Sequence, residues 1–203
     1  MARIDYYCSP LSPYTYLAGD RPERIAAAHG HSLHYKPLDV IALFSRTGGT
    51  APKDRHPSRQ EYRAQELRRQ ALKAGMPLNL RPAHWPTNAA PACYAIIAAQ
   101  AEAEKGGSGD VGAVLRALAT ACWADEKDIS RDETVREGLE AGGFDPGLAD
   151  RGLMMGAERY AANLEGALNA GCFGLPFWIT EGDERFWGQD RLDDLDAHLA
   201  GRL

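Results

Sequence analysis

Apolar and polar positions divide the chain into two short α/β segments, one at each end, and a long helical stretch between them. Near the start, residues 3–8 and 33–38 are β-prone runs with alternating apolar positions. Residues 13–28 between them have a helical pattern, with a kink expected near Arg21-Pro22 and a glycine C-cap at Gly30. The first segment therefore predicts a β–α–β unit.

The middle of the chain has helical periodicity almost throughout. Residues 58–75 are charged and helix-prone, whereas residues 89–105 and 110–125 are rich in alanine with apolar residues at helical spacing. Three further helices are expected at residues 131–142, 145–155 and 157–171. Residues 46–57 form the one long irregular stretch, and loops of that length are often functional.

The last fifth of the chain returns to strands. Residues 177–180 and 185–187 predict two strands joined by a polar turn at residues 181–184, and residues 190–203 predict a final helix. A βαβ start and a ββα finish around helices predict an α/β, thioredoxin-like fold with a large all-helical insertion. We expect the thioredoxin-like domain to comprise residues 1–45 and 166–203, and the insertion residues 46–165.

Composition narrows the classes of protein to which the chain can belong. A net charge of −5 argues against a nucleic-acid binder, and no apolar run is long enough to span a membrane. The N-terminus lacks the pattern of a secretory signal, so a cytoplasmic protein is expected. No cysteines stand at Cys-x-x-Cys spacing and no Cys/His cluster predicts a metal site, so buried thiols are expected at Cys8, Cys93, Cys122 and Cys172.

The segment Ser12-Pro13-Tyr14-Thr15 follows the first strand after the break at residues 9–11 and opens a helix. It resembles a thioredoxin-type Cys-Pro-x-Cys turn in which Ser12 and Thr15 stand in place of the two cysteines. Thiol–disulfide exchange is therefore disfavoured, because neither residue can form a disulfide. The helix start still favours an anion such as a thiolate. The alternative is that Ser12 is only an N-cap.

Further motifs follow in a fixed order. They are Gly75-Met76-Pro77-Leu78, Tyr160 to Asn163 ahead of residues 171–176, and Phe186 to Leu192. With the Ser-Pro-Tyr turn, these motifs resemble 2-hydroxychromene-2-carboxylate isomerases and the related kappa-class glutathione transferases. Both belong to the DsbA-like branch of the thioredoxin superfamily, and the resemblance covers nearly the whole chain.

The resemblance implies glutathione as the cofactor. Ser12 would be the catalytic residue, its hydroxyl donating to the bound sulfur. Pro176 would be the cis-proline of the fold, although an ordinary trans proline at a strand start is the alternative. Asp190 would meet the α-ammonium of glutathione, whereas Arg191 is expected to form a structural salt bridge. The implied glutathione-binding residues are Ser12, Pro13, Tyr14, Leu175, Pro176, Trp187, Gly188, Gln189 and Asp190.

The substrate side follows less directly from the motifs. Arg55 suits a bidentate contact with a carboxylate, and Trp85 could stack on a bicyclic aromatic. The alternative is that Arg55 and Lys53 are solvated loop charges. The chain departs from the family pattern, since a lysine used there falls near Phe44 and an asparagine near Asp54. The implied substrate residues are Asp54, Arg55, Trp85 and Asn88, and Cys8 and Cys172 are expected to pack rather than react.

The activity that the resemblance implies is glutathione-dependent isomerisation of a 2-hydroxychromene-2-carboxylate-like intermediate of aromatic degradation. Thiolate addition, bond rotation and elimination would leave no net redox change. The alternatives are a kappa-type glutathione transferase or peroxidase, and a non-catalytic glutathione-binding protein. The expected partners are a small aromatic carboxylate and a second copy of the chain in a homodimer, with no nucleic acid and no membrane.

Overall fold

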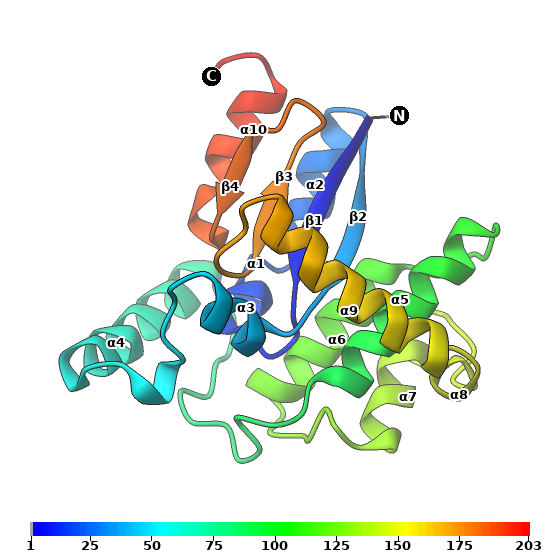
Figure 1. Ribbon diagram of the computed structural model, residues 1–203, viewed down its shortest axis with the longest axis horizontal. Coiled ribbons are helices and arrows are strands. Elements are labelled where there is room, and N and C mark those ends of the chain that lie inside the picture. Colours follow the sequence, from blue (N-terminus) through cyan, green and yellow to red (C-terminus); the bar gives the residue numbers. More distant parts are fainter. Residues whose placement is uncertain (1) are drawn as a thin grey trace.

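A mixed four-stranded sheet forms the centre of the molecule (Figure 1). The structure, a computed structural model, describes residues 2–203. The strands are β1 (Ala2–Cys8), β2 (His31–Pro37), β3 (Phe177–Ile179) and β4 (Arg185–Trp187), in the order β2-β1-β3-β4. β1 and β2 are parallel, whereas β3 is antiparallel to both β1 and β4. The βαβ start and ββα finish are thus confirmed, and so is the thioredoxin-like fold class.

Side chains of β1 alternate between two cores on opposite faces of the sheet. Ile4, Tyr6 and Cys8 face the larger core, which the helices of the middle segment also fill. Tyr7 faces a smaller core with Phe177 and Ile179 of β3. Because both faces of β1 pack against a core, the strand is almost wholly buried after Asp5.

The helical run after β1 is two helices rather than one kinked helix. α1 (Pro13–Ala18) ends where Gly19 adopts a φ of 59° and donates its N–H to Tyr16 O. α2 (Arg21–Ala28) then begins with Pro22 in its first turn. The expected kink near Arg21-Pro22 was therefore wrong, because Gly19 ends α1 and the proline starts a new helix.

A helix missed in the sequence follows β2. α3 (Val40–Arg46) is capped by Asp39, whose carboxylate accepts the N–H groups of Ile41 and Ala42. An aspartate directly before an apolar run is the signal that would have found it. The irregular stretch that we expected at residues 46–57 holds only a short 3-10 helix, η1 (Pro52–Asp54).

The middle segment is helical as predicted. Its helices are α4 (Pro57–Ala74), α5 (Ala90–Glu104), α6 (Val111–Trp123), α7 (Asp132–Ala141), α8 (Leu148–Arg151) and α9 (Leu153–Asn169). The single helix expected at 145–155 was wrong, since α8 ends at Arg151 and Gly152 separates it from α9. The expected helix at 190–203 is shorter, consisting of η2 (Gln189–Arg191) and α10 (Leu192–Leu199).

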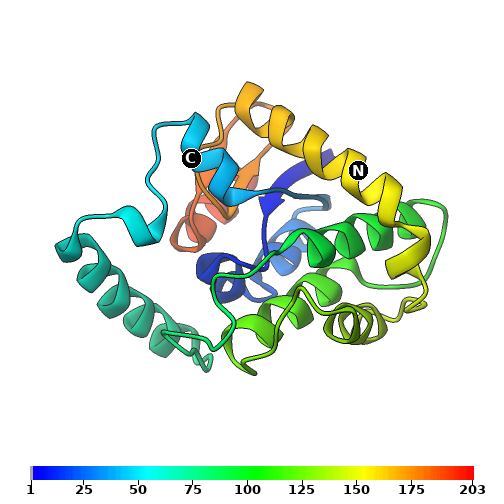
Figure 2. The same ribbon diagram turned by 60° about the horizontal axis from the view of Figure 1, so that its bottom comes forward.

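The helices surround the sheet unevenly (Figure 2). α5 packs against α6, α9 and β2, whereas α4 extends to one side and packs mainly on α1. We retain as a proposal the division into residues 1–45 with 166–203 and an insertion of 46–165. α9 continues across its second boundary and packs on β2 and α3. None of the helices described in residues 2–203 is both long and apolar enough to cross a membrane.

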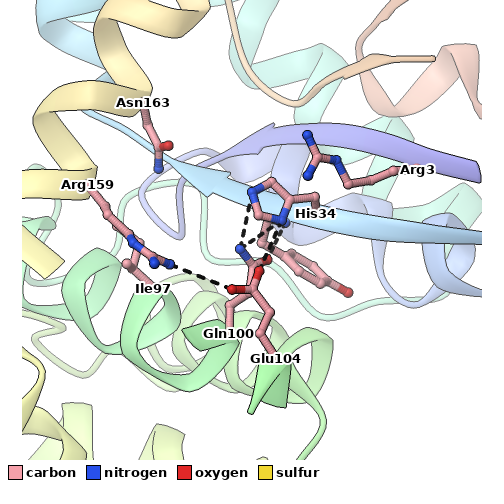
Figure 3. A pocket seen from close by; sticks show the side chains of 8 residues that line it. Arg3, His34, Ile97, Gln100, Glu104, Arg159 and Asn163 are labelled. Carbon is pink, nitrogen blue, oxygen red and sulfur yellow. Dashed lines mark hydrogen bonds and ion pairs between the residues drawn. The ribbon is translucent and has the colours of Figure 1, made fainter. Parts of the chain in front are cut away.

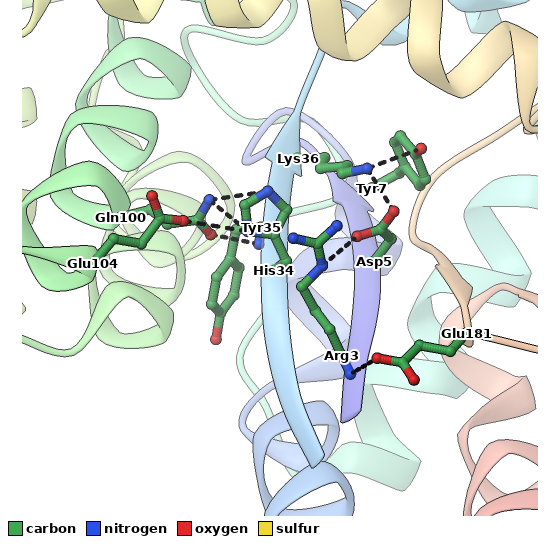
Figure 4. Close-up of polar contacts among 9 residues, drawn as sticks. All are labelled: Arg3, Asp5, Tyr7, His34, Tyr35, Lys36, Gln100, Glu104 and Glu181. Atoms are coloured by element: carbon green, nitrogen blue, oxygen red, sulfur yellow. Dashed lines mark hydrogen bonds and ion pairs between the residues drawn. The ribbon is translucent and has the colours of Figure 1, made fainter. Parts of the chain in front are cut away.

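Polar contacts tie β2 to its neighbours on either side (Figure 4). The Gln100 side chain of α5 accepts the Tyr35 N–H at 2.6 Å, so α5 covers a main-chain donor of this edge strand. On the sheet surface, the Lys36 ammonium bonds the Asp5 carboxylate at 2.5 Å. The helical segment is therefore fixed to the sheet by hydrogen bonds as well as by apolar packing.

Candidate functional site

Ser12 lies where β1 passes into α1 and is almost fully buried, with 6% of its surface exposed. Its Oγ accepts the Thr15 N–H at 3.3 Å, which makes it the N-cap of α1. The same hydroxyl donates to the Leu175 carbonyl oxygen at 3.2 Å. Ser12 is therefore a cap, as the alternative interpretation held, and also the link between the turn and the Leu175-Pro176 segment.

The Leu175-Pro176 peptide is cis, which confirms that expectation. The Pro176 carbonyl accepts the Gly188 N–H at 3.0 Å, so the start of η2 is held against it. The Leu175 N–H donates to no other group within residues 2–203, although Leu175 is only 5% exposed. A buried residue with its N–H free and its carbonyl facing Ser12 suits an extended peptide ligand.

Gly188 sits at a point where only glycine fits well. Its φ is 100° and its ψ 146°, and a Cβ there would lie 2.6 Å from Asp190 Oδ1. The neighbouring Gln189 is buried, and its side chain bonds Arg21 of α2 and Gln70 of α4. Asp190 is exposed and pairs with Arg191 at 3.1 Å. Arg191 also bonds Asp194, which confirms its expected salt-bridge role.

Two indole groups from the middle segment hold the turn before Ser12. Trp85 Nε1 donates to the Leu11 carbonyl at 3.2 Å, and Trp123 Nε1 donates to the Pro10 carbonyl at 3.1 Å. The two rings also contact each other, with their centroids 5.6 Å apart. The helical segment therefore fixes the main chain on which Ser12 is mounted.

The predicted substrate residues are distributed around this turn. Arg55 Nε donates to the Thr50 carbonyl, and its guanidinium lies 5.6 Å from the Phe44 ring centre. Trp85 is half-buried beneath the guanidinium of Arg63, which is 5.2 Å from its ring centre. Asn88 is exposed, and its side chain accepts the N–H of Ala90, the first residue of α5. Asp54 is exposed on η1.

An aromatic pocket of about 250 Å³ adjoins the cis-proline segment. Phe44, Phe173 and Trp187 contribute rings to its lining, and Arg55 contributes its charge. The Phe173 and Trp187 rings meet edge to face with centroids 4.8 Å apart, and both side chains are exposed. The pocket can therefore take a flat aromatic group beside a guanidinium.

The cysteines lie in the interior, as expected. Burial raises the pKa of the Cys8 thiol well above its ordinary value, and the neighbouring Cys93 adds to the effect. Burial likewise raises the pKa of Cys172 to about 12. Thiols held in the protonated form are poor nucleophiles, so these cysteines have packing roles.

A second pocket, of about 300 Å³, lies at the edge of β2 (Figure 3). Its charged side chains largely have partners, since Glu104 lies 3.8 Å from Arg159 and Arg3 lies 3.4 Å from Asp5. None of the residues predicted for the site line it. The Ser12 turn is therefore the better candidate site.

Comparison with known proteins agrees with the fold. Residues 3–200 match the DSBA-like thioredoxin domain model. A 2-hydroxychromene-2-carboxylate isomerase from Sphingobium xenophagum is 30% identical, with 97% of each chain covered. The chain belongs to this isomerase family of DSBA-like thioredoxin domains. The isomerase of Pseudomonas putida is 27% identical over 98% of this chain and 95% of its own.

Comparison with solved structures finds similarity to the same family. A solved 2-hydroxychromene-2-carboxylate isomerase superposes with a TM-score of 0.79 at 26% identity. The match covers 98% of this chain and 95% of that one, so the helical segment is shared along with the thioredoxin-like part.

Three residues important to the site were missed in the sequence. Trp123 holds the turn and Arg21 holds Gln189, but both act across the fold and no local pattern marks them. Arg63 is different, because it stands four residues after Arg59 on the same helix and eight after Arg55, which precedes that helix. That i, i+4, i+8 spacing is a signal that could have drawn attention to it.

Proposed function

We propose that this protein is a glutathione-dependent isomerase that acts on a 2-hydroxychromene-2-carboxylate or a close relative of it. The observation that carries the proposal is the Ser12 hydroxyl, buried between the start of α1 and the carbonyl of Leu175 with no protein thiol at position 12 or 15. Membership of the isomerase family supports the reaction class.

The residues around Ser12 fit glutathione. Leu175, two residues before β3, offers an N–H that is free within residues 2–203 and a carbonyl, which suits the main chain of the cysteinyl unit. Pro13 starts α1 without an N–H, so the first free main-chain donor of the helix is that of Tyr14. When bound, glutathione would supply the thiolate that adds to a conjugated carbon and leaves again after bond rotation.

The Ser12 hydroxyl would change its acceptor when a peptide binds. In the structure its proton points to Leu175 O. A peptide N–H arriving at that carbonyl would replace the serine donor, and the Ser12 hydroxyl could then turn to a neighbouring sulfur. Such a hydrogen bond stabilises a thiolate and lowers the pKa of the thiol.

The other end of glutathione would lie at the Gly188 turn. The Asp190 carboxylate is exposed there and could meet an ammonium group. The Trp187 side chain is 52% exposed and could cover the peptide. Because Arg21 and Gln70 already bond the Gln189 side chain, Gln189 would act by fixing this turn in place.

The aromatic pocket formed by Phe44, Phe173 and Trp187 supports an aromatic substrate. Arg55 would balance the charge of its carboxylate, and Trp85 would act chiefly by holding the Leu11 carbonyl, since Arg63 covers its ring. We retain Asp54 and Asn88 as proposed rim residues of the substrate site. A homodimer also remains a proposal, which sedimentation velocity would test.

The decisive experiment follows a 2-hydroxychromene-2-carboxylate by ultraviolet absorbance with glutathione far below the substrate concentration. We expect many turnovers per glutathione and no loss of free thiol. Stoichiometric loss of thiol would instead indicate the kappa-type transferase alternative. Conversion that is equally fast without glutathione would overturn the proposal.

A further inference from the structure

Arg63 of α4 is a half-buried arginine without an acceptor. Within residues 2–203 its guanidinium forms no hydrogen bond and no ion pair, and its one polar contact is with the face of Trp85. Burial lowers the pKa of this arginine, since the charged form has lost solvent. Its N–H groups are still open to solvent on the side of the guanidinium that does not contact Trp85.

Three of the other half-buried arginines are bonded to protein acceptors, whereas Arg55 is bonded only through its Nε. Arg21 bonds Gln189 and two helix carbonyls, and Arg116 bonds Glu23 and Asp110. Arg136 bonds Asp132 and Asp150. Arg63 differs from these three in having N–H groups that face solvent rather than a protein acceptor, so they are available to an anion that binds from outside the chain.

Two further donors, Tyr14 and Arg55, are close enough to Arg63 for their charges to affect its pKa. The Tyr14 hydroxyl forms no hydrogen bond within the described residues, although burial raises its pKa. The positive charges of Arg63 and Arg55 are both close enough to oppose that rise. Arg55 uses only its Nε, for the Thr50 carbonyl, so its terminal N–H groups are free.

Within residues 2–203, no carboxylate forms a hydrogen bond or ion pair with Arg63, Arg55 or the Tyr14 hydroxyl. Glu66, the acid nearest to Tyr14 on α4, is bonded by Arg69 and Gln70. Asp190 is paired with Arg191. The result is a group of hydrogen-bond donors from three segments of the chain. The acidic residues discussed above are bonded to other side chains.

We propose that Arg63, together with Arg55 and the Tyr14 hydroxyl, binds a carboxylate next to the Ser12 turn, with Arg63 as a specificity-determining residue. A carboxylate offers acceptors only, and an arginine can bind it through two parallel hydrogen bonds. This proposal rests on the proposed function, which supplies two sources of the group: the aromatic substrate and the glycyl end of glutathione.

Calorimetric titration separates the sources. The probes are chromone-2-carboxylate, chromone, glutathione and γ-glutamylcysteine, which lacks the glycyl carboxylate. Arg63→Gln should weaken the binding of one carboxylate probe at least tenfold, whereas Arg68→Gln should leave the binding unchanged. Arg68 is the matched control because it is exposed on the same helix. Loss confined to chromone-2-carboxylate assigns the substrate, and loss confined to glutathione, with γ-glutamylcysteine unchanged, assigns the glycyl end.

Clear outcomes would overturn the proposal. These are unchanged affinity of both carboxylate probes in Arg63→Gln, an equal loss in Arg68→Gln, or an equal loss for chromone, which has no carboxylate. Arg63→Lys keeps the charge but not the paired N–H groups of the guanidinium, so an intermediate loss of affinity is expected. This variant replaces Arg63→Gln in the titrations if Arg63→Gln does not fold. Binding that depends on Arg63 in a protein with no isomerase turnover would refute the proposed reaction while supporting this site.

Discussion

Ser12 joins two parts of the chain that are 163 residues apart in sequence. Its Oγ caps α1, and its hydroxyl donates a hydrogen bond to the carbonyl that precedes the cis-proline. A cap alone would be satisfied by aspartate or asparagine, but an aspartate could not donate to Leu175. The hydroxyl is therefore the group that serves both contacts.

Replacing Ser12 with alanine should affect catalysis more than folding. Loss of the cap should lower the free energy of unfolding by about 1 kcal/mol. Loss of the donor should lower turnover by about a hundredfold and raise the pKa of bound glutathione, since a single preorganised donor is typically worth that much. Turnover assays and thiolate absorbance against pH measure the two effects.

Asp110→Ala is the matched control, because Asp110 caps α6 through the Ala113 N–H and lies outside the proposed site. It should lose stability with little change in the pKa of bound glutathione. Full turnover in the Ser12→Ala variant would remove the serine from the mechanism.

Gly188→Ala should destabilise the turn that carries Asp190. A φ of 100° with a ψ of 146° costs an alanine about 1–3 kcal/mol, and a Cβ there would also press on Asp190 Oδ1. Gly30→Ala is the comparison, since Gly30 also has a positive φ, of 70°, but nothing within 4 Å of a Cβ. Urea unfolding should therefore show a larger loss for Gly188→Ala, whereas equal losses would argue that no contact with Asp190 matters.

At the scale of elements, the middle helices position the turn that carries Ser12. Trp85, which precedes α5, and Trp123, which ends α6, donate to two successive carbonyls, those of Leu11 and Pro10. Because both donors belong to the helical segment, movement of that segment would move the turn with it. The insertion is thus part of the machinery that orients Ser12.

Trp123→Phe should weaken both stability and glutathione binding. The change leaves the buried Pro10 carbonyl without its donor, which typically costs about 1–3 kcal/mol. Trp178→Phe is a matched control, because Trp178 is fully buried and its Nε1 has no partner within residues 2–203. Calorimetric titration with glutathione should show the loss in Trp123→Phe only; an equal loss in both would assign the effect to packed volume.

At the scale of the molecule, a hydrogen-bond chain joins the sheet to α5. Since Gln100 Oε1 accepts the Tyr35 N–H, its amide nitrogen must donate, and it does so to His34 Nδ1 at 3.0 Å. His34 Nδ1 is therefore unprotonated in the folded state. Burial lowers the pKa of His34, and Arg3 adds to that effect while Asp5 and Glu104 oppose it.

Stability should consequently fall on mild acidification. The unfolded chain binds a proton at His34 near its ordinary pKa of about 6.5, whereas the folded protein binds it only at lower pH. The contribution is complete above that pH and is lost as pH falls from about 6.5 through the folded pKa. Urea midpoints across this range should drop less in His34→Gln than in the parent, and exposed His84→Gln should resemble the parent.

Local patterns predicted much of the fold. The alternation in residues 3–8 and 33–38, the helical spacing from residue 58 onward and the polar turn at 181–184 each produced the expected element. The predicted helices were wrong where two local signals, such as a glycine and a nearby proline, favoured different helix boundaries. Gly19 ended α1 before the proline could kink it, and Asp39 started a helix in a segment that lacked an evident period.

By itself the sequence determined the fold class, the turn without cysteines and its likeness to the isomerase family, because these depend on short-range pattern and on motif order. Only the tertiary structure decided which donors have acceptors. It showed that Trp85 holds the Leu11 carbonyl beneath Arg63, and that Arg63 itself has no acceptor among residues 2–203. The physical reason is that hydrogen-bond satisfaction and burial depend on segments far apart in the chain, and these meet only once the helices pack on the sheet.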